Sequence, residues 1–150
     1  MGVTKAFLFV ASALAACVCL HAAEPEAVYT AEQAAVGRTA YESSCAACHT
    51  DSLIPAADAV YKGQRIPPLA GTSFLARWGA RNTQELSSRI RDAIGGFPPK
   101  DLREDTFLAL TAYVLQSNGA RPGPQELKEE TAVAWRTASE GPHDETQPLR

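Results

Sequence analysis

The stretch that most constrains this chain of 150 residues is the run Cys-Ala-Ala-Cys-His at positions 45–49. Cys45 and Cys48 lie three positions apart, so at the end of a helix both thiols can reach the vinyl groups at one edge of a porphyrin. His49 follows directly and is placed to offer an imidazole nitrogen to the iron. The run therefore predicts covalent attachment of one haem through Cys45 and Cys48, with His49 as the ligand of the metal.

Three other kinds of site use the same residue types. A dithiol redox pair shares the C-x-x-C spacing, but it belongs in a βαβ context and does not need the following histidine. A zinc site needs a second pair of ligands, and downstream of His49 only His143 remains among the cysteines and histidines. A disulfide between Cys45 and Cys48 would close a very small loop. The motif alone leaves these alternatives open, and the start of the chain favours haem.

Residues 1–23 are predicted to be a signal peptide. Lys5 is the one charged residue before Glu24, and residues 6–20 are almost entirely apolar. That run is long enough for the apolar part of an export signal and short for a helix that spans a membrane. We therefore expect a periplasmic protein, whose thiols are removed from cytosolic redox chemistry and lie in the compartment where haem is attached.

Two cleavage sites compete within this leader. Residues 14–17 read Leu-Ala-Ala-Cys and resemble the lipobox of bacterial lipoproteins, so cleavage before Cys17 would leave a lipidated thiol that attaches the protein to a membrane. The other site lies near residues 22–23, where bulky Leu20 or His21 occupies a position that is usually small. We favour the lipobox for that reason. With the second site, Cys17 is a small hydrophobic residue of a discarded leader.

The rest of the chain is long enough for one modest domain. We expect a linker over residues 24–30, a domain over 31–120 and a polar C-terminal tail over 121–150, in which residues 126–138 are a candidate helix. The formal net charge is −3 at pH 7 and there is no basic run. This composition gives no sign of a nucleic-acid partner.

The domain is expected to contain four main helices. Three of them begin after a capping residue that is followed three positions later by Glu or Gln, namely Thr30 with Gln33, Asn82 with Glu85, and Asp101 with Glu104. Glycines after residues 94 and 118 end the last two helices. Residues 50–66 have the character of a loop. The expected helices cover residues 31–44, 72–79, 83–94 and 102–117.

Gly37 and Tyr41 precede the 45–49 run in the spacing Gly-x-x-x-Tyr-x-x-x-Cys-x-x-Cys-His. This spacing resembles the N-terminal helix and haem motif of class I cytochromes c. The resemblance implies an all-α fold in which the N- and C-terminal helices cross, while short helices and loops wrap one haem. It also implies that Gly37 and Tyr41 pack against Leu110 and Tyr113 of the last helix.

Residues 67–71, Pro-Pro-Leu-Ala-Gly, resemble the P-x-L-x-G stretch of the same family. The resemblance implies that the carbonyl group of Pro67 accepts a hydrogen bond from the second ring nitrogen of His49, which fixes the tautomer of the imidazole. It also implies that Leu69 presses on the face of the haem. A plain turn built by two prolines and a glycine is the alternative interpretation.

From Pro67 to Gly119 the chain is similar to the c-type cytochrome domains associated with quinoprotein dehydrogenases. Residues 74–79 and 112–119 carry that likeness, and together with the haem helix the resemblance covers about residues 31–120. It implies a mono-haem electron carrier rather than an enzyme. The expected partner is a periplasmic redox protein, such as a quinoprotein dehydrogenase.

The chain departs from the family at the second axial ligand of the iron. Class I cytochromes usually place a methionine opposite the histidine, but the one methionine here is Met1, and Ile94 stands where the similar domains have methionine. The second axial position of the iron would then be filled by water, by Lys100 or by His143, or it would stay open. An open site implies an alternative function, a five-coordinate haem protein that binds a small ligand as a gas sensor or binder, or a weak peroxidase.

Overall fold

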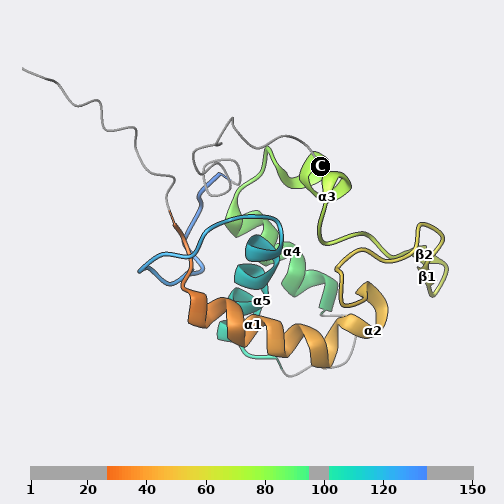
Figure 1. Ribbon diagram of the computed structural model, residues 1–150, viewed down its shortest axis with the longest axis horizontal. Helices are drawn as coiled ribbons and strands as arrows, with labels where there is room; N and C mark the ends of the chain where they lie inside the picture. The colour runs from red at the N-terminus through yellow and green to blue at the C-terminus, as the bar shows by residue number, and fades with distance from the viewer. Residues whose placement is uncertain (1–26, 95–101, 135–150) are drawn as a thin grey trace, which may run out of the picture.

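The computed structural model describes residues 27–94 and 102–134, and within them the protein is mostly helical (Figure 1). This agrees with the all-α class that the sequence predicts. The two short strands form one antiparallel hairpin. The elements in chain order are α1 (Ala31–Ser44), α2 (Ala46–His49), β1 (Val60–Tyr61), β2 (Gln64–Arg65), α3 (Thr72–Trp78), α4 (Thr83–Ile94) and α5 (Glu104–Ser117).

Several sequence predictions concern parts of the chain outside the described residues. They are the signal peptide with its lipobox at Cys17, and the candidate iron ligands Lys100 and His143. Ile94 is the last residue of α4, and its backbone is described but its side chain is not. Among the described helices, none has both the length and the apolar character needed to cross a bilayer.

Helices α1 and α5 cross at Gly37, as the sequence predicts (Figure 1). A Cβ atom on Gly37 would lie 1.8 Å from the carbonyl oxygen of Ala109 and 2.4 Å from its carbonyl carbon. The two backbones can therefore approach this closely only because residue 37 has no side chain. One turn further along α1, the ring of Tyr41 packs on the ring of Tyr113, with centroids 5.2 Å apart and planes inclined by 52°.

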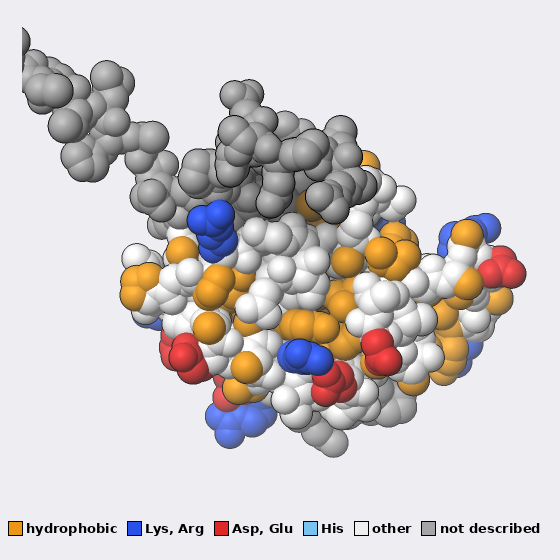
Figure 2. All heavy atoms as spheres, viewed as in Figure 1, with side chains coloured by type: hydrophobic (Ala, Val, Ile, Leu, Met, Phe, Trp, Pro, Cys, Tyr) orange, Lys and Arg blue, Asp and Glu red, His pale blue; other side chains and the backbone are white. Residues whose placement is uncertain are grey.

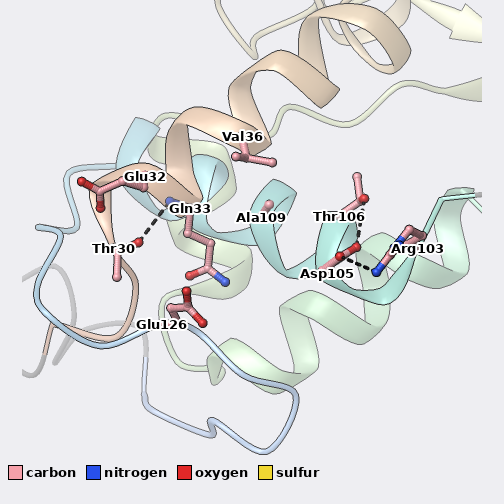
Figure 3. Close-up of a pocket in the computed structure, with 9 residues that line it drawn as sticks. All are labelled: Thr30, Glu32, Gln33, Val36, Arg103, Asp105, Thr106, Ala109 and Glu126. Carbon is pink, nitrogen blue, oxygen red and sulfur yellow. Dashed lines mark hydrogen bonds and ion pairs between the residues drawn. The ribbon is translucent and has the colours of Figure 1, made fainter.

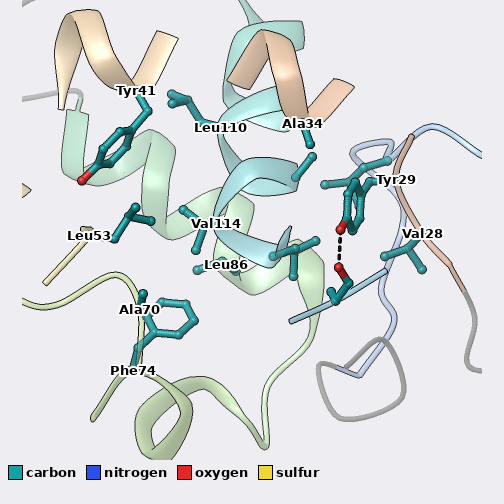
Figure 4. Close-up of a cluster of buried hydrophobic side chains, with 14 residues drawn as sticks. Val28, Tyr29, Ala34, Tyr41, Leu53, Ala70, Phe74, Leu86, Leu110 and Val114 are labelled. Carbon is teal, nitrogen blue, oxygen red and sulfur yellow. Dashed lines mark hydrogen bonds between the residues drawn. The ribbon is translucent and has the colours of Figure 1, made fainter. Parts of the chain in front are cut away.

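The hydrophobic core lies around this crossing (Figure 4). Burial of apolar side chains from α1, α3, α4 and α5 supplies the main driving force for packing the helices together. The largest fully buried apolar or aromatic side chains are those of Tyr29, Tyr41, Phe74, Leu110 and Leu115. Phe74 also stacks on Trp78 one turn further along α3, which confirms a short helix with one buried face.

Helix α1 is capped by Thr30, whose hydroxyl group accepts a hydrogen bond from the backbone N–H of Gln33 at 3.1 Å. The side chain of Gln33 does not complete a capping box. Its amide instead donates to the carbonyl oxygen of Leu127 and accepts from the N–H of the same residue. At α4 the predicted box is complete, because Asn82 and Glu85 exchange both hydrogen bonds.

The predicted start of the last helix is wrong. Helix α5 begins at Glu104 with Arg103 as its N-cap residue, and Asp101 lies outside the described residues. Glu104 forms an ion pair with Arg91 of α4. The predicted C-terminal end of α5 is confirmed, since Asn118 is the C-cap and Gly119 follows with φ of +95°.

The described part of the expected linker, residues 27–30, is packed into the domain. Val28 and Tyr29 are buried, and the hydroxyl group of Tyr29 donates to the carbonyl oxygen of Ala120. The N–H of Gly123 in turn donates to the carbonyl oxygen of Tyr29 at 2.8 Å. The segment before α1 is thus hydrogen-bonded to the segment that follows α5.

The described part of the expected tail, residues 121–134, is not helical and lies against the domain. The helix predicted over residues 126–138 is therefore wrong as far as the chain is described. Leu127 is 2% exposed, and Thr83 at the start of α4 exchanges hydrogen bonds with the backbone of Thr131 and Val133. The backbone of this segment is therefore hydrogen-bonded to Gln33 of α1 and Thr83 of α4 instead of forming a helix of its own.

Candidate functional site

The Cys-x-x-Cys-His run folds as one helical turn directly after α1. Cys45 ends α1 by donating its N–H to the carbonyl oxygen of Tyr41, and its own carbonyl oxygen then accepts from the N–H of His49 at 2.9 Å. Cys45 is half-buried and Cys48 is exposed, and both are free thiols. The turn therefore carries two free thiols and the histidine on one short helical segment.

The pKa of the Cys45 thiol is raised to about 11, first by burial and second by the neighbouring Cys48. Such a thiol is protonated at neutral pH and is a poor nucleophile. A dithiol redox pair needs the opposite, an attacking cysteine whose pKa is lowered. Among the described residues the two-residue antiparallel strands also provide no βαβ unit around the motif.

The imidazole of His49 is held by the backbone of Pro67. Nδ1 lies 3.0 Å from the carbonyl oxygen of Pro67, which confirms the contact that the sequence predicts. Because a carbonyl oxygen can only accept, Nδ1 carries the proton and the lone pair is on Nε2. Burial lowers the pKa of His49 below its ordinary value, although the bond to Pro67 opposes that shift. The neutral tautomer thus favoured is the form in which histidine ligates a metal through Nε2.

The loop of residues 67–71 is fixed by residues from two other parts of the chain. The N–H of Leu69 donates to the carbonyl oxygen of Leu53 at 2.8 Å. The side-chain amide of Asn118 donates to the carbonyl oxygen of Leu69 at 2.9 Å and accepts from the N–H of Gly71 at 3.1 Å. Leu69 is half-buried and packs against the core. Sequence reasoning treated Asn118 as a helix stop alone and missed this contact.

A second side chain missed by sequence reasoning holds the residue that follows His49. Thr50 has φ of +63° and ψ of 166°, a backbone region that side chains strongly disfavour. Its carbonyl oxygen accepts a hydrogen bond from the hydroxyl group of Tyr41 at 2.6 Å. The sequence predicts only a packing role for Tyr41, yet its phenol also ties the end of the His49 turn to α1.

The apolar side chain of Ile54 lies beside the 67–71 loop. It is 52% exposed, and its Cδ1 atom is 3.4 Å from the position that a Cβ atom of Gly71 would take. Val60 and Tyr61 of the hairpin are also exposed. Figure 2 shows hydrophobic side chains open to solvent on the projecting hairpin, next to charged ones. The segment between His49 and Pro67 therefore presents apolar surface.

Two grooves lie elsewhere on the protein. One, of about 560 Å³, runs between the N-terminal ends of α1 and α5, and its lining includes the charged residues Glu32, Arg103 and Asp105 (Figure 3). The other, of about 370 Å³, lies along α4 beside Trp78. Neither is lined by the cysteines or the histidine of the motif. Cys45, Cys48 and His49 thus lie outside both of these grooves.

Within the described residues, no group of three or more His, Cys, Asp or Glu side chains is close enough together to hold a metal ion. The partners that a zinc site would need beside Cys45 and Cys48 are thus not found in that part of the chain. Two thiols and one imidazole with a fixed tautomer do match what covalent haem attachment requires. The sequence matches no protein-family model, and no curated protein and no solved structure matches it.

Proposed function

We propose that this chain is an exported protein of the class I cytochrome c type, with one haem bound covalently by Cys45 and Cys48 and ligated by His49. Its function in this proposal is to carry electrons to or from a periplasmic redox enzyme. The observation that carries the proposal is the hydrogen bond from Nδ1 of His49 to the carbonyl oxygen of Pro67. The histidine directly follows Cys48, and both Cys45 and Cys48 are free thiols close to it in the chain.

Each of these residues has a definite task in the proposal. Cys45 and Cys48 would hold the porphyrin at the end of α1 through thioether bonds, each made by adding an S–H group across one vinyl double bond. His49 would hold the iron through the lone pair of Nε2, and Pro67 increases the donor strength of the ring by accepting the hydrogen bond from Nδ1–H. Leu69, on the same loop as Pro67, would lie against one face of the porphyrin. When bound, the haem supplies a one-electron couple of the iron.

The crossing of α1 and α5 supports the proposal because it gives the turn a rigid base. Gly37 and Tyr41 pack against the backbone at Ala109 and the ring of Tyr113, so the helix that ends in the motif is held along one side. Electron transfer needs little rearrangement around the metal, and a motif on a firmly packed helix meets that need. The apolar surface at Ile54, next to the 67–71 loop, is also suited to lie against an apolar macrocycle.

The partner in this proposal is a periplasmic redox protein, with a quinoprotein dehydrogenase as the specific candidate. Cleavage before Cys17 and lipidation of its thiol would keep the carrier at the membrane. Methionine is absent from residues 2–150, so a thioether ligand, which raises the potential in cytochromes c, is not available there. We therefore expect a potential below that of carriers with a His/Met pair.

The missing methionine is also the observation that favours a second candidate function. A five-coordinate iron would bind a small ligand, and the protein would then act as a gas sensor or binder or as a weak peroxidase. Titration of the purified protein with carbon monoxide separates the two functions. A reduced spectrum that is low-spin and unaffected by carbon monoxide supports the carrier, while a high-spin spectrum that shifts supports the ligand binder. Variants Lys100→Ala and His143→Ala test whether either residue supplies a low-spin ligand.

A further inference from the structure

The side chain of Asn118 joins the last helix to the loop that holds His49. Its Nδ2 atom donates to the carbonyl oxygens of Val114, at 2.8 Å, and Leu69, at 2.9 Å. Its Oδ1 atom accepts from the N–H of Gly71 at 3.1 Å. Both partners of the half-buried amide in the loop, Leu69 and Gly71, are thus bound by the one side chain, and the bond to Val114 holds that side chain on α5. The amide donates to the carbonyl group of Leu69 and accepts from the N–H of Gly71, as the backbone of a neighbouring β-strand would do.

The loop depends on this amide because of its own sequence. Pro67 and Pro68 have no N–H group, so neither can anchor the loop by donating a hydrogen bond. The first backbone donor is that of Leu69, which is bound to the carbonyl oxygen of Leu53. Asn118 supplies the complementary restraint from the other side, at the carbonyl oxygen of Leu69 and the N–H of Gly71.

The geometry points to Asn118 as a positioning residue for His49. By holding Leu69 and Gly71, it fixes the carbonyl group of Pro67 two residues upstream, and so sets the strength of the Nδ1–H···O=C bond and the donor strength of Nε2. This inference rests on the proposed function, because donor strength matters only if His49 ligates a metal. It adds to that function a residue that touches neither the histidine nor the macrocycle.

The test compares the haem-loaded full-length protein with the variant Asn118→Leu, which keeps the size of the side chain and removes all three hydrogen bonds. The matched control is Ser117→Ala. It removes a hydrogen bond from a side chain to the backbone at the same helix end, from the Ser117 hydroxyl to the carbonyl oxygen of Tyr113, and does not touch the loop. Two quantities are measured, the exchange rate of the His49 Nδ1 proton by NMR and the reduction potential.

In the Asn118→Leu variant we expect the Nδ1 proton to exchange about tenfold faster, because one hydrogen bond is weakened. The potential should rise, since a less basic imidazole stabilises the oxidised iron less. Ser117→Ala should leave both quantities at the wild-type values. Rates and potentials that are equal in Asn118→Leu and wild type would overturn the inference while leaving the proposed function intact. A wild-type protein that acquires no haem would overturn both.

If Asn118→Leu yields no folded protein, Asn118→Asp decides the question. That variant keeps the shape of the side chain and the acceptor for Gly71, but it can no longer donate to Leu69. Faster exchange of the Nδ1 proton supports the role of Asn118, and unchanged exchange contradicts it. The exchange rate is used here because the added negative charge would itself change the potential.

Discussion

The hydroxyl group of Tyr41 donates a hydrogen bond to the carbonyl oxygen of Thr50 at 2.6 Å, across the whole Cys-x-x-Cys-His turn. Thr50 has φ of +63°, so its backbone is held where a residue with a side chain is strained. The same tyrosine ring packs on Tyr113 of α5. One side chain therefore links the crossing of the two long helices to the turn that carries His49.

Replacing Tyr41 with Phe should destabilise the protein by about 1 kcal/mol, because the hydrogen bond is lost while the ring packing stays. The free energy of unfolding measured by urea denaturation checks this value. Tyr113→Phe is the control, since it removes the hydroxyl group of the packing partner and leaves the bond to Thr50 in place. Equal losses in the two variants would mean that the bond to Thr50 contributes nothing specific.

Replacing Gly37 with Ala should destabilise the protein by about 1–3 kcal/mol, although alanine favours helices more than glycine does. The added Cβ would lie 1.8 Å from the carbonyl oxygen of Ala109, so α1 and α5 must separate. The control Val36→Ala, at a side chain that is 59% exposed, should leave stability nearly unchanged. Thermal denaturation of both variants provides the comparison. A more stable Gly37→Ala protein would contradict the close helix crossing.

Replacing Leu127 with Ala should destabilise the protein by about 2–5 kcal/mol, the usual effect of truncating a buried leucine. Leu127 is 2% exposed, while its neighbour Lys128 is exposed and serves as the matched control. The measurement is again the free energy of unfolding. If both alanine variants behaved like the wild type, residues 121–134 would not be part of the folded domain.

The stability of the protein before haem attachment should fall as the pH falls from about 7 to about 5. Burial lowers the pKa of His49 in the folded state, so below the ordinary value of 6.5 the unfolded chain takes up a proton that the folded chain does not. Folding stability is therefore full above that value and is lost towards lower pH. His49→Gln should flatten this dependence. A profile with the same slope in His49→Gln would show that another group is responsible.

Sequence reasoning succeeded where a residue pattern acts locally or through a close backbone contact. The capping box of Asn82 and Glu85 places the start of α4, and the glycine at position 37 locates the helix crossing. The bond between His49 and Pro67 was also expected, but from a family resemblance rather than from physical reasoning about the loop.

It failed where a side chain serves a distant part of the chain. Glu104 looked like the second half of a capping box, yet it pairs with Arg91 of another helix. Gln33 was expected to cap its own helix and instead binds the backbone of Leu127. No local pattern reveals such partners, because they are chosen by tertiary packing.

The hairpin of β1 and β2 was missed for a different reason. Its turn residues Lys62 and Gly63 both have positive φ, at 49° and 77°, which is the geometry of a tight hairpin turn. A lysine in the first of these positions is a weak signal compared with asparagine or aspartate. The sequence pattern of residues 50–66 therefore predicts a loop and does not reveal the hairpin.

The mass of the intact, denatured protein after maturation in a bacterium that attaches haem tests the central claim most directly. We predict that the wild-type mass exceeds that of the bare chain by one haem, and that the variant with Cys45→Ala and Cys48→Ala has the bare mass and no colour. A wild-type protein that is colourless and has the mass of the bare chain would contradict the account.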